Sequence, residues 1–498
     1  MKQQPPASIA AVDLGSSSFH LVVADTVNGH FKVIDRLREM VRLGAGLDAA
    51  NRLSPVAAER ALRCLERFGE RVRHLPQGAV RVVGTNTLRK ARNAQEFIRQ
   101  AEVALGHPVD VISGHEEARL IFLGVSHGLE DDADLRLVID IGGGSTEVIL
   151  GRRFEPLYME SLHTGCVSMS ETYFADGAID AKRMRAAEIA ARQEFEPVEA
   201  EFRGAAWESA IGTSGTILAV RSVLVGQGWS DDAITREGLE RLRATVVAGR
   251  HVDALAALGV AAERRPIFPG GLAILLGAFE EIGIDHLRVA DSALREGVLY
   301  DLLGRIHDED VRDRTIEHLR DRYHVDRAQA ARVNATAQDL LGKLATVWAL
   351  EKPEHGQLLA WAAALHEIGQ AISHSQYHKH GAYLLRYLDM PGFARGEQAR
   401  LATLVRGHRR KVPLSEFAAA SESAASEILR LCVVLRLAVV LHRRRSADVP
   451  PALGVKAEGE SIRLTFPKGW LEAHPLTSAD LEQEAAYLRP AGFKLRVK

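Results

Sequence analysis

An internal repeat constrains the fold of this chain more than any other feature of its sequence. The segment IAAVDLGSSSFHLVV, residues 9–23, aligns with LVIDIGGGSTEVIL, residues 137–150, at an offset of 127 positions. Each segment has the pattern of a strand, an Asp-x-Gly turn and a second strand, and the alignment places Asp13 opposite Asp140. Two such units predict two similar α/β domains that face each other across a cleft, each contributing one turn to a shared ligand.

Both turns have the composition of a phosphate site. A glycine turn lets the backbone approach a ligand closely, and successive N–H groups in such a turn form a nest for anionic oxygens. Because a carboxylate at the end of a strand would repel a bare phosphate, Asp13 and Asp140 predict a divalent cation between them and the phosphate, and Mg²⁺ with retained waters fits best. The sequence does not determine whether the side chain of Glu147, beyond the second turn, faces the cleft.

Two further segments carry groups that suit phosphate. The stretch AIGTSGTILAV, residues 210–220, follows a short apolar run and is compatible with a third phosphate-binding turn or with a plain helix cap. In GTNTLRKARN, residues 84–93, Arg89, Lys90 and Arg92 follow a strand, where they either bind phosphate beside a helix N-terminus or form a solvated basic face. Neither GxxxxGKS/T nor GxGxxG occurs, so the P-loop and Rossmann signatures have no support.

A carboxylate near these turns is a candidate for activating water. In SGHEEARLIFLGV, residues 113–125, Ser113 and Glu116 have the S-x-x-E spacing of a capping box, so Glu116 is expected to bind the backbone at the start of a helix. Glu117 is then left free. Because hydrolysis at phosphorus depends on placing the attacking water, a free carboxylate beside a phosphate site can orient or deprotonate that water.

The order of the predicted elements divides the 498 residues into four domains. Up to about residue 305, β-branched runs alternate with helical patterns, whereas from there to 446 apolar residues recur at helical spacing. After Pro450 and Pro451, the chain predicts a hairpin, a capped helix and a last strand. The predicted domains are two α/β domains, residues 1–128 and 129–305, an all-α domain, residues 306–446, and a small α+β domain, residues 447–498.

Composition narrows the environment of the protein. The three cysteines, Cys64, Cys166 and Cys432, are odd in number and far apart, which favours reduced thiols and a cytoplasmic location over a disulfide framework. The N-terminal residues lack the apolar run of a signal peptide. The apolar segment 428–441 is interrupted by arginine and is shorter than the ~20 residues of a membrane-spanning helix, so no transmembrane segment is expected.

Six segments resemble, in the same order, the exopolyphosphatase and guanosine pentaphosphate phosphatase (Ppx/GppA) family, and above all its long exopolyphosphatases. They are AVDLGSSSFHL, GTNTLRKARN, ISGHEEARLIFLGV, VIDIGGGSTEV, IGTSGT and VADSALREGVLYDLL. The resemblance is specific in the first 300 residues and looser beyond them. It implies two actin-like (ribonuclease-H-like) α/β domains that close over phosphates, then an all-α domain related to HD phosphohydrolases and a small α+β C-terminal domain.

The resemblance also implies roles for individual residues. Glu117 would be the catalytic carboxylate that acts on water, and Asp140 and Glu147 would bind Mg²⁺ or assist that water. The other implied site residues are Asp13, Gly15, Ser16, Ser17 and Ser18 in a first phosphate loop, Gly142, Gly143, Gly144, Ser145 and Thr146 in a second, Gly212, Thr213, Ser214, Gly215 and Thr216 in a third contact, and Arg89 and Arg92 at basic positions.

The activity implied by the resemblance is Mg²⁺-dependent, processive hydrolysis of terminal orthophosphate from inorganic polyphosphate. The alternative is a guanosine-5′-triphosphate,3′-diphosphate (pppGpp) 5′-phosphohydrolase, because both substrates end in a phosphoanhydride. Two other activities rank below these. A small-metabolite kinase of the same superfamily lacks an acceptor-pocket signature in this chain, and intact Glu117, Asp140 and Glu147 count against a non-hydrolytic polyphosphate or nucleotide sensor. A homodimer is expected from the resemblance alone.

The helical half departs from a working HD site. The expected His-Asp pair is His366-Glu367 in this chain. The other histidines of the region are His374, His378, His380 and His408. With the aspartate missing, packing or polyanion contact is favoured over metal binding for these histidines.

Residues 391–446 hold eleven Lys or Arg against four Asp or Glu, in a chain whose net charge is −2. This excess predicts a track for a long phosphate chain, although a solvated basic surface remains the alternative. A membrane surface would also suit the charge, whereas nucleic acid is disfavoured because no series of aromatic residues accompanies it. The track residues are Arg406, Arg409, Arg410, Lys411, Arg443, Arg444 and Arg445.

Overall fold

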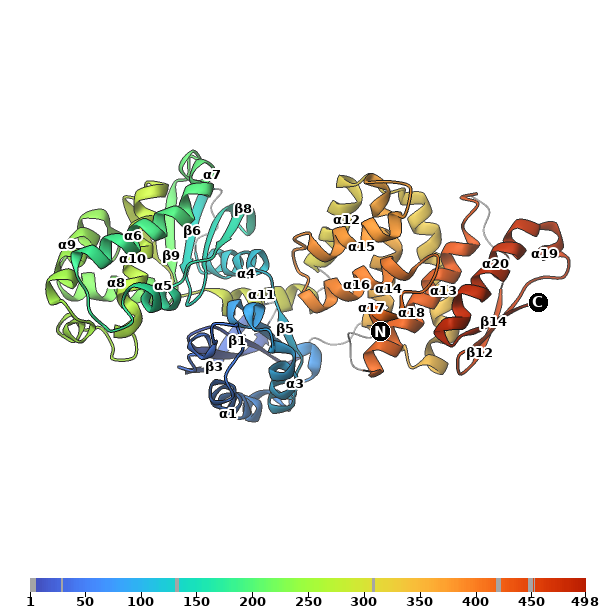
Figure 1. Ribbon diagram of the computed structural model, residues 1–498, viewed down its shortest axis with the longest axis horizontal. Coiled ribbons are helices and arrows are strands. Elements are labelled where there is room, and N and C mark those ends of the chain that lie inside the picture. Colours follow the sequence, from blue (N-terminus) through green and yellow to red (C-terminus); the bar gives the residue numbers. More distant parts are fainter. Residues whose placement is uncertain are drawn as a thin grey trace. The chain divides into compact units, whose positions relative to one another are not determined.

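The structure is a computed structural model that describes residues 6–27, 30–129, 134–306, 310–417, 422–446, 451 and 453–498. It divides into two compact units, Met1–Asp310 and Val311–Lys498, which Figure 1 draws in one colour scale. Residues 447–450, with the expected start of the small C-terminal domain, lie outside the described part, as do residues 1–5 of the segment expected to lack a signal peptide. The division into four domains stays a prediction, and each unit is described by itself.

The first unit contains a five-stranded mixed sheet near its N-terminus (Figure 1). The strand order is β3-β2-β1-β4-β5, in which β1, β2 and β3 pair antiparallel and β1, β4 and β5 pair parallel. The strands are β1 (Ser8–Leu14), β2 (Phe19–Val27), β3 (His30–Glu39), β4 (Val80–Gly84) and β5 (Val109–Val111). The helices of this half are α1 (Pro55–Val72), α2 (Asn86–Lys90) and α3 (Ala94–Leu105).

A six-stranded sheet follows with the same design. Its order is β10-β11-β9-β6-β7-β8, in which β6, β7 and β8 pair antiparallel and β6, β9 and β11 pair parallel. The strands are β6 (Leu135–Ile141), β7 (Thr146–Arg152), β8 (Glu155–Leu162), β9 (Ser209–Thr213), β10 (Ile234–Thr235) and β11 (His286–Val289). The β1–β2 and β6–β7 hairpins are the two repeats, so the repeat in the sequence is confirmed as a repeat in structure.

The second sheet carries most of the helices of this unit. They are α5 (Cys166–Tyr173), α6 (Ala181–Phe195), α7 (Glu199–Arg203), α8 (Gly215–Gly226), α9 (Arg236–Gly249) and α10 (Phe268–Ile282). α10 is apolar on nearly every side and buried, and it packs in one core with α6, α8 and the strands β6 and β9.

Two helices join the sheets, α4 (Gly114–His127) and α11 (Leu294–Ile306). One buried core combines Val83 of the first sheet and Ile149 of the second with apolar residues of both helices. The helices approach closely because each presents a glycine to the other. A Cβ at Gly297 would lie 1.8 Å from the carbonyl oxygen of Leu120, and one at Gly124 would lie 2.1 Å from that of Ala293.

Buried charges also link α4 and α11. Asp301 of α11 binds the guanidinium groups of Arg81 and Arg119, and Arg119 donates to Glu116 Oε2 at 2.7 Å. Ser113 caps α4 as predicted, because its hydroxyl accepts from the Glu116 N–H at 3.1 Å. The prediction for the Glu116 carboxylate needs correction, since the carboxylate binds the two buried arginines. Moving the two helices apart would leave buried charges without their partners. The cluster therefore holds α4 and α11 in one relative position.

The second unit consists of helices followed by a three-stranded sheet (Figure 1). The helices before the sheet are α12 (Val311–Arg322), α13 (Arg327–Trp348), α14 (Pro353–Leu365), α15 (Tyr377–Tyr387), α16 (Arg395–Gly407), α17 (Leu414–Phe417) and α18 (Glu422–Leu441). The tail contains the expected hairpin, helix and strand, as β12 (Gly454–Glu458), β13 (Ser461–Thr465), α19 (Trp470–Ala473), α20 (Pro475–Leu488) and β14 (Lys494–Val497). The relation to HD phosphohydrolases stays a prediction.

None of the helices formed by the described residues combines the length and apolar character needed to cross a membrane.

Candidate functional site

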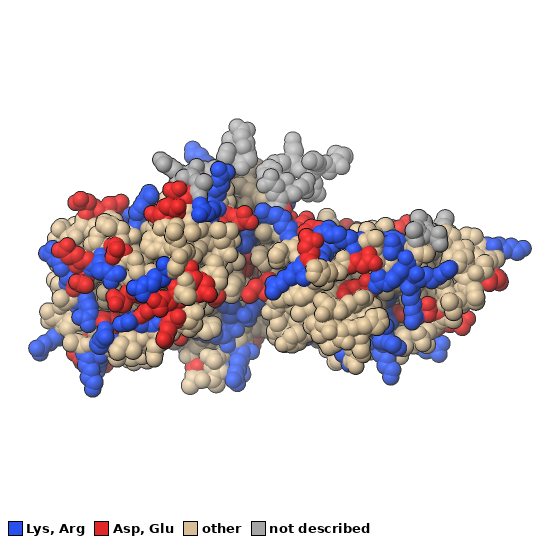
Figure 2. Space-filling view, turned by 90° about the horizontal axis from the view of Figure 1, so that it is seen from above, with Lys and Arg blue, Asp and Glu red and all other residues tan. Residues whose placement is uncertain are grey.

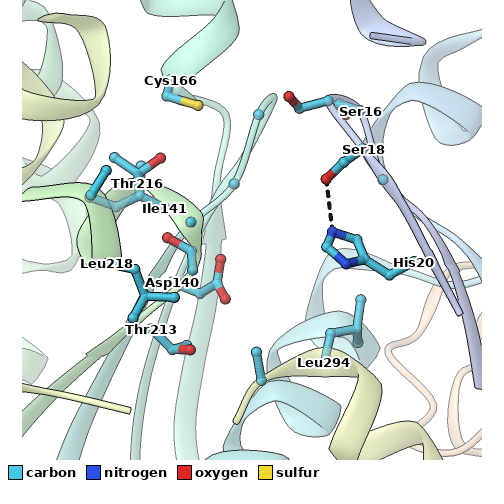
Figure 3. Close-up of a pocket in the computed structure, with 18 of the residues that line it drawn as sticks. Ser16, Ser18, His20, Asp140, Ile141, Cys166, Thr213, Thr216, Leu218 and Leu294 are labelled. Atoms are coloured by element: carbon cyan, nitrogen blue, oxygen red, sulfur yellow. Dashed lines mark hydrogen bonds between the residues drawn. The ribbon is translucent and has the colours of Figure 1, made fainter. Parts of the chain in front are cut away.

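A cavity of about 460 Å³ opens in the first unit where loops of the two sheets meet. Figure 3 shows Ser18 and His20 on one side of this cavity and Asp140 and Thr213 on the other. The lining loops are residues 15–18 between β1 and β2, residues 142–145 between β6 and β7, and residues 213–216 between β9 and α8. The three turns singled out in the sequence therefore share one cavity.

The first loop offers free backbone donors. Its carbonyl groups are used, since Ser16 O and Ser17 O accept from Gly44 and Arg42 at 2.8 and 2.7 Å. No described residue accepts a hydrogen bond from the N–H groups of residues 15–18. Ser16 Oγ also accepts from Thr87 Oγ1 at 2.8 Å. A fixed loop with a run of free N–H groups suits an anionic oxygen.

The second loop rests on the N-terminus of α5. The Cys166 N–H donates to Gly142 O at 2.9 Å, and the N–H groups of Gly143 and Gly144 have no acceptor within the described part of the chain. Glycine is needed here for a close approach between the two halves of the unit. A Cβ on Gly144 would lie 2.8 Å from Asn86 Oδ1 of α2.

The third loop is both a turn and the start of a helix. Ser214 lies between β9 and α8 with φ of 94°, a left-handed value that is strained for serine and marks functional sites. Thr213 is fixed by its hydroxyl, which donates to Ser292 O at 2.9 Å. The first N–H groups of α8 have no acceptor within their own helix. Ser214 occupies the N-cap position of α8 without a side-chain cap hydrogen bond, and the turn lines the cavity. Phosphate binding by this turn stays a prediction.

Asp140 and Glu147 are direct partners across the β6–β7 hairpin. Directly opposed residues of two antiparallel strands project from the same face of the sheet, so the two carboxylates lie on one side. Glu147 thus shares a sheet face with Asp140, but it is buried and, unlike Asp140, does not line the cavity. Glu147 Oε1 accepts from Ser161 Oγ at 2.8 Å. Burial raises the pKa of Glu147 well above its usual range, and the charges of Glu117 and Asp140 add to the effect.

The pKa values of Asp13 and Asp140 are both raised. Burial and the charge of Glu117 raise each pKa to about 7, against the opposing charge of Arg295. Within the described part of the molecule, Asp13 Oδ1 is buried without a hydrogen-bond partner. A bound cation would stabilise the ionised form of these buried carboxylates and would give the unpaired oxygen of Asp13 a partner.

These carboxylates fit the expected Mg²⁺ only if the ion takes most of its ligands from outside the protein. The described residues contain no group of three or more His, Cys, Asp or Glu side chains arranged to hold a metal ion. A Mg²⁺ ion at Asp13 and Asp140 would therefore take its remaining ligands from water and from a phosphate, which is how this ion is usually bound.

Glu117 lies in the first turn of α4 and lines the cavity. Its Oε2 accepts from Arg89 Nη1 at 2.6 Å, and the same Arg89 nitrogen donates to Ile112 O at 3.2 Å. No described residue binds its Oε1, which is left for a ligand or a water. The positive end of the helix dipole also favours a negative charge at this position.

Some predicted phosphate contacts lie elsewhere. Arg92 is exposed and does not line the cavity, because α2 ends at Lys90 and the chain turns away. Arg89 binds the Glu117 carboxylate rather than lining the cavity. Thr146 and Gly212 lie behind the lining, and Thr146 Oγ1 is used to donate to Thr164 O at 2.8 Å. In this structure Arg89 thus contacts the Glu117 carboxylate, and a phosphate contact by Arg89 or Arg92 stays a prediction.

Four basic side chains of the cavity were missed by the sequence reasoning. They are His20, Arg38, Arg264 and Arg295. His20 lies inside the first repeat, and Arg295 lies in the segment VADSALREGVLYDLL that carries the family resemblance, so a signal was present for both. Arg38 on β3 and Arg264 before α10 lie in segments without a motif, and only the fold brings them to the loops.

Three histidines of the helical unit, His366, His378 and His408, are buried close together. His366 and His408 each bind a backbone carbonyl through Nδ1, Ala363 O at 2.8 Å and Val405 O at 2.6 Å, and their rings lie 5.5 Å apart. Burial lowers the pKa of both rings, which favours their neutral form. Glu367 is bound by Arg445. This agrees with the packing role that the sequence favours for the histidines of this region.

The predicted polyanion track is partly neutralised. Arg406 pairs with Glu416 at 3.2 Å, Arg443 pairs with Asp480, and Arg445 pairs with Asp326 and Glu367. The track contains two other arginines, Arg409 and Arg410, that line a small cavity of about 100 Å³ together with Arg443. On the face that Figure 2 shows, basic and acidic side chains are interspersed. The excess of positive charge is therefore reduced by Glu416 within the segment and by Asp326, Glu367 and Asp480 outside it. Polyanion binding stays a prediction.

The three cysteines are buried and form no disulfide, as their number and spacing predict.

Known proteins resemble both units. A model of the Ppx/GppA phosphatase family matches residues 22–306, and a model of Ppx/GppA phosphatase, domain III, matches residues 311–485. Two curated relatives are named guanosine-5′-triphosphate,3′-diphosphate pyrophosphatase. The one from Aeromonas hydrophila is 39% identical over 488 residues, and the one from Pseudoalteromonas translucida is 40% identical over 490 residues, each match covering 98% of both chains.

A solved structure, an exopolyphosphatase from Cytophaga hutchinsonii, matches with a TM-score of 0.55 and 24% identity over 60% of this chain and 98% of its own, which shows a shared fold. The family models match almost the whole chain, and the relatives match it end to end with the same name. The chain therefore belongs to the Ppx/GppA phosphatase family and is a phosphoanhydride hydrolase.

Proposed function

We propose that this protein is a pppGpp 5′-phosphohydrolase, which releases the terminal phosphate of the 5′-triphosphate of guanosine 5′-triphosphate 3′-diphosphate. The curated relatives carry this substrate in their name and match 98% of the chain. The observation that carries the proposal is that the cavity combines a group of carboxylates with two arginines, Arg38 and Arg264, that no carboxylate of the described residues neutralises.

The two arginines, Arg38 and Arg264, line the cavity, and neither pairs with a carboxylate among the described residues. Burial and the charge of Arg38 lower the pKa of Arg264. Arg264 also lies against the third loop, since a Cβ on Gly215 would lie 1.9 Å from its Nη2. Two cationic side chains without a carboxylate partner suit a second anionic group of the substrate. The 3′-diphosphate of pppGpp is such a group.

In the hydrolytic step, each oxygen of the Glu117 carboxylate has its own role. A water is placed in line with the terminal phosphorus, Glu117 Oε1 accepts a proton from it, and the water oxygen forms the new bond to phosphorus. The bond between that phosphorus and the bridging oxygen breaks, so the bridging oxygen and its electron pair leave with ppGpp. Arg89 holds Glu117 Oε2 so that Oε1 faces the water.

The loops and a cation would take up the phosphate charge. Free N–H groups of residues 15–18 and of Gly143 and Gly144 would bind the oxygens of the terminal phosphate. When bound, Mg²⁺ held by Asp13 and Asp140, with Glu147 beside them, would neutralise charge on the phosphate chain.

Exopolyphosphatase activity is the second candidate, and it is the activity that the sequence resemblance placed first. The same arginine pair favours it, because Arg38 and Arg264 would equally bind later phosphates of a linear chain. It ranks second for two reasons. The predicted basic track of the helical unit is interrupted by ion pairs, and the full-length relatives carry the other substrate in their name.

The arginine pair provides the test. Arg38→Met and Arg264→Met should each raise KM for pppGpp about 10-fold, as expected for a lost charge-assisted contact, while KM for GTP, which has no 3′-diphosphate, stays within 2-fold. Lys32→Met is the matched control, because Lys32 is exposed on the same strand as Arg38 and does not line the cavity. Equal effects on pppGpp and GTP would contradict the assignment of the pair to the 3′-diphosphate.

A further inference from the structure

His20 lines the cavity, and the roles given above leave it without a function. It lies directly opposite Asp13 in the β1–β2 hairpin, as Glu147 lies opposite Asp140 in the β6–β7 hairpin. The two hairpins are repeats of each other, so His20 occupies in the first the position that a carboxylate occupies in the second. The first hairpin therefore presents an imidazole on the face where Asp13 projects.

Two hydrogen bonds fix the state of the His20 ring. Its Nδ1 lies 3.0 Å from Nη1 of Arg295, and its Nε2 lies 2.8 Å from Oγ of Ser18, the contact drawn in Figure 3. A guanidinium has only donors, so Nδ1 must be the acceptor. The ring is then neutral and carries its proton on Nε2. Burial and the charges of Arg295, Arg38 and Arg264 lower the pKa of His20 to about 3, which agrees with a neutral ring.

The state of the ring determines the direction of the Ser18 hydroxyl. The Nε2–H of His20 donates to Ser18 Oγ, so the hydroxyl proton has to point to a different acceptor. No residue of the described chain accepts it. Ser18 lines the cavity beside the free N–H groups of its own loop. An acceptor oxygen in the cavity would complete the chain of donors.

We propose that Arg295 and His20 are positioning residues that turn the Ser18 hydroxyl into a hydrogen-bond donor to the terminal phosphate of the substrate. This inference rests on the proposed hydrolysis of a terminal phosphate in this cavity. The three residues form one chain from Arg295 through His20 to Ser18, and each member donates to the next. Arg295 comes from α11 and the other two from the first hairpin, so the chain also connects the hairpin to the helix that joins the two sheets.

Loss of the hydrogen bonds from Arg295 through His20 to Ser18 should lower the rate of hydrolysis. Without the donor on Nε2, the Ser18 hydroxyl can turn to another acceptor and no longer favours the phosphate. Removal of one preorganised donor from an anionic transition state costs about 100-fold in kcat. His20→Phe keeps a ring of similar size and removes both hydrogen bonds, whereas His20→Gln keeps an amide donor near the position of Nε2.

A double-mutant cycle tests the coupling. We expect His20→Phe and Ser18→Ala each to lower kcat/KM about 30- to 100-fold, and the double variant to lose no more than Ser18→Ala alone, because both changes remove the same donor. His20→Gln should recover to within about 5-fold of the wild type, since it still donates to Ser18. Independent losses that multiply in the double variant would overturn the relay and leave His20 a structural residue. His74→Gln is the control, because His74 is exposed and does not line the cavity.

A measurement without turnover separates this inference from the proposed function. In protein labelled with ¹⁵N-histidine, the His20 signals, assigned by their loss in His20→Gln, should show a protonated Nε2 and a bare Nδ1 between pH 6 and pH 8. Arg295→Met should change this pattern, and a protonated Nδ1 in the wild type would refute the relay. If no phosphoanhydride is hydrolysed, the proposed function fails, and the ring measurement still decides whether the donor chain exists.

Discussion

Arg89 and Glu117 form a hydrogen-bonded ion pair of 2.6 Å at the edge of the cavity. Arg89 is itself held by the carbonyl of Ile112, so the pair fixes one oxygen of the carboxylate and leaves the other for a water. We predict that Arg89→Met lowers kcat about 100-fold, because a base displaced by about 1 Å from its water loses that much. KM should change by less than 3-fold, and steady-state phosphate release provides both constants.

The control for Arg89→Met is Arg92→Met. Arg92 is equally basic and lies three residues along the same segment, but its side chain is exposed and outside the cavity lining. Arg92→Met should retain kcat within 2-fold of the wild type. A loss of activity in Arg92→Met that matches the loss in Arg89→Met would show that the segment acts through its charge and not through the contact with Glu117.

Gly165 packs closely against the second cavity loop, residues 142–145. A Cβ at this position would lie 2.4 Å from the backbone nitrogen of Gly144 and 2.5 Å from the carbonyl carbon of Gly143. Because backbone atoms cannot move aside without moving the loop, Gly165→Ala should lower kcat/KM about 100-fold, the loss expected when phosphate donors are displaced.

Gly226 at the end of α8 is the control for that substitution. A Cβ there meets no atom within 4 Å, and its φ is not positive, so Gly226→Ala should leave kcat/KM unchanged and stabilise the helix by about 0.5–1 kcal/mol. Thermal unfolding and phosphate release on the two variants check both statements. Full activity in Gly165→Ala would mean that the loop does not need its observed position.

The helical unit should lose stability in mild acid. Burial lowers the pKa of His366, His378 and His408, to about 4 for His378, whose pKa the charges of Arg406 and Arg409 lower further. The unfolded chain binds protons near pH 6.5, the unperturbed value for histidine. The stabilisation is therefore complete above about pH 6.5 and is lost as the pH falls from there toward the folded-state values.

Thermal unfolding between pH 7.5 and pH 5 measures this effect. We expect the Tm of the transition of the helical unit to fall across this range, and His378→Gln, which cannot gain a proton, to show a smaller fall. His374→Gln is the control, because His374 is exposed in the same region. If His378→Gln and the wild type lose stability in parallel, groups other than this histidine set the pH dependence.

The part of the site that the sequence could predict is the part encoded by local pattern. Asp13 and Asp140 lie near the ends of buried strands that lead into glycine turns, and this local pattern predicted the two loops that line the cavity. The phosphate and the cation expected there stay predictions. The repeat also predicted that the loops face each other, because two copies of one hairpin at domain spacing suggest a shared ligand. The helix cap at Ser113, followed by Glu117 in the first turn, is local in the same sense.

The remaining part of the site depends on contacts that no local pattern encodes. The strand register that places Glu147 beside Asp140 depends on how many residues the turn takes up, which the sequence left open. Arg38 reaches the cavity from an edge strand and Arg264 from a loop before a helix, so only the complete fold brings them together. The ion pairs of the predicted polyanion track could not be foreseen, because the partners of Arg443 and Arg445 are Asp480 and Asp326, far away in the sequence. Polyanion binding by these arginines stays a prediction.

The most direct test of the account is the specificity of the wild-type protein for its substrate. The value of kcat/KM should be measured with Mg²⁺ on pppGpp, GTP and long-chain polyphosphate, with one preparation and with Glu117→Gln as the inactive control. The arginine pair predicts that kcat/KM for pppGpp exceeds that for GTP about 10-fold or more, as expected for charge-assisted contacts to the 3′-diphosphate. The proposed function predicts that it also exceeds kcat/KM for long-chain polyphosphate. A higher kcat/KM on long polyphosphate, or equal values for pppGpp and GTP, would contradict the proposed function.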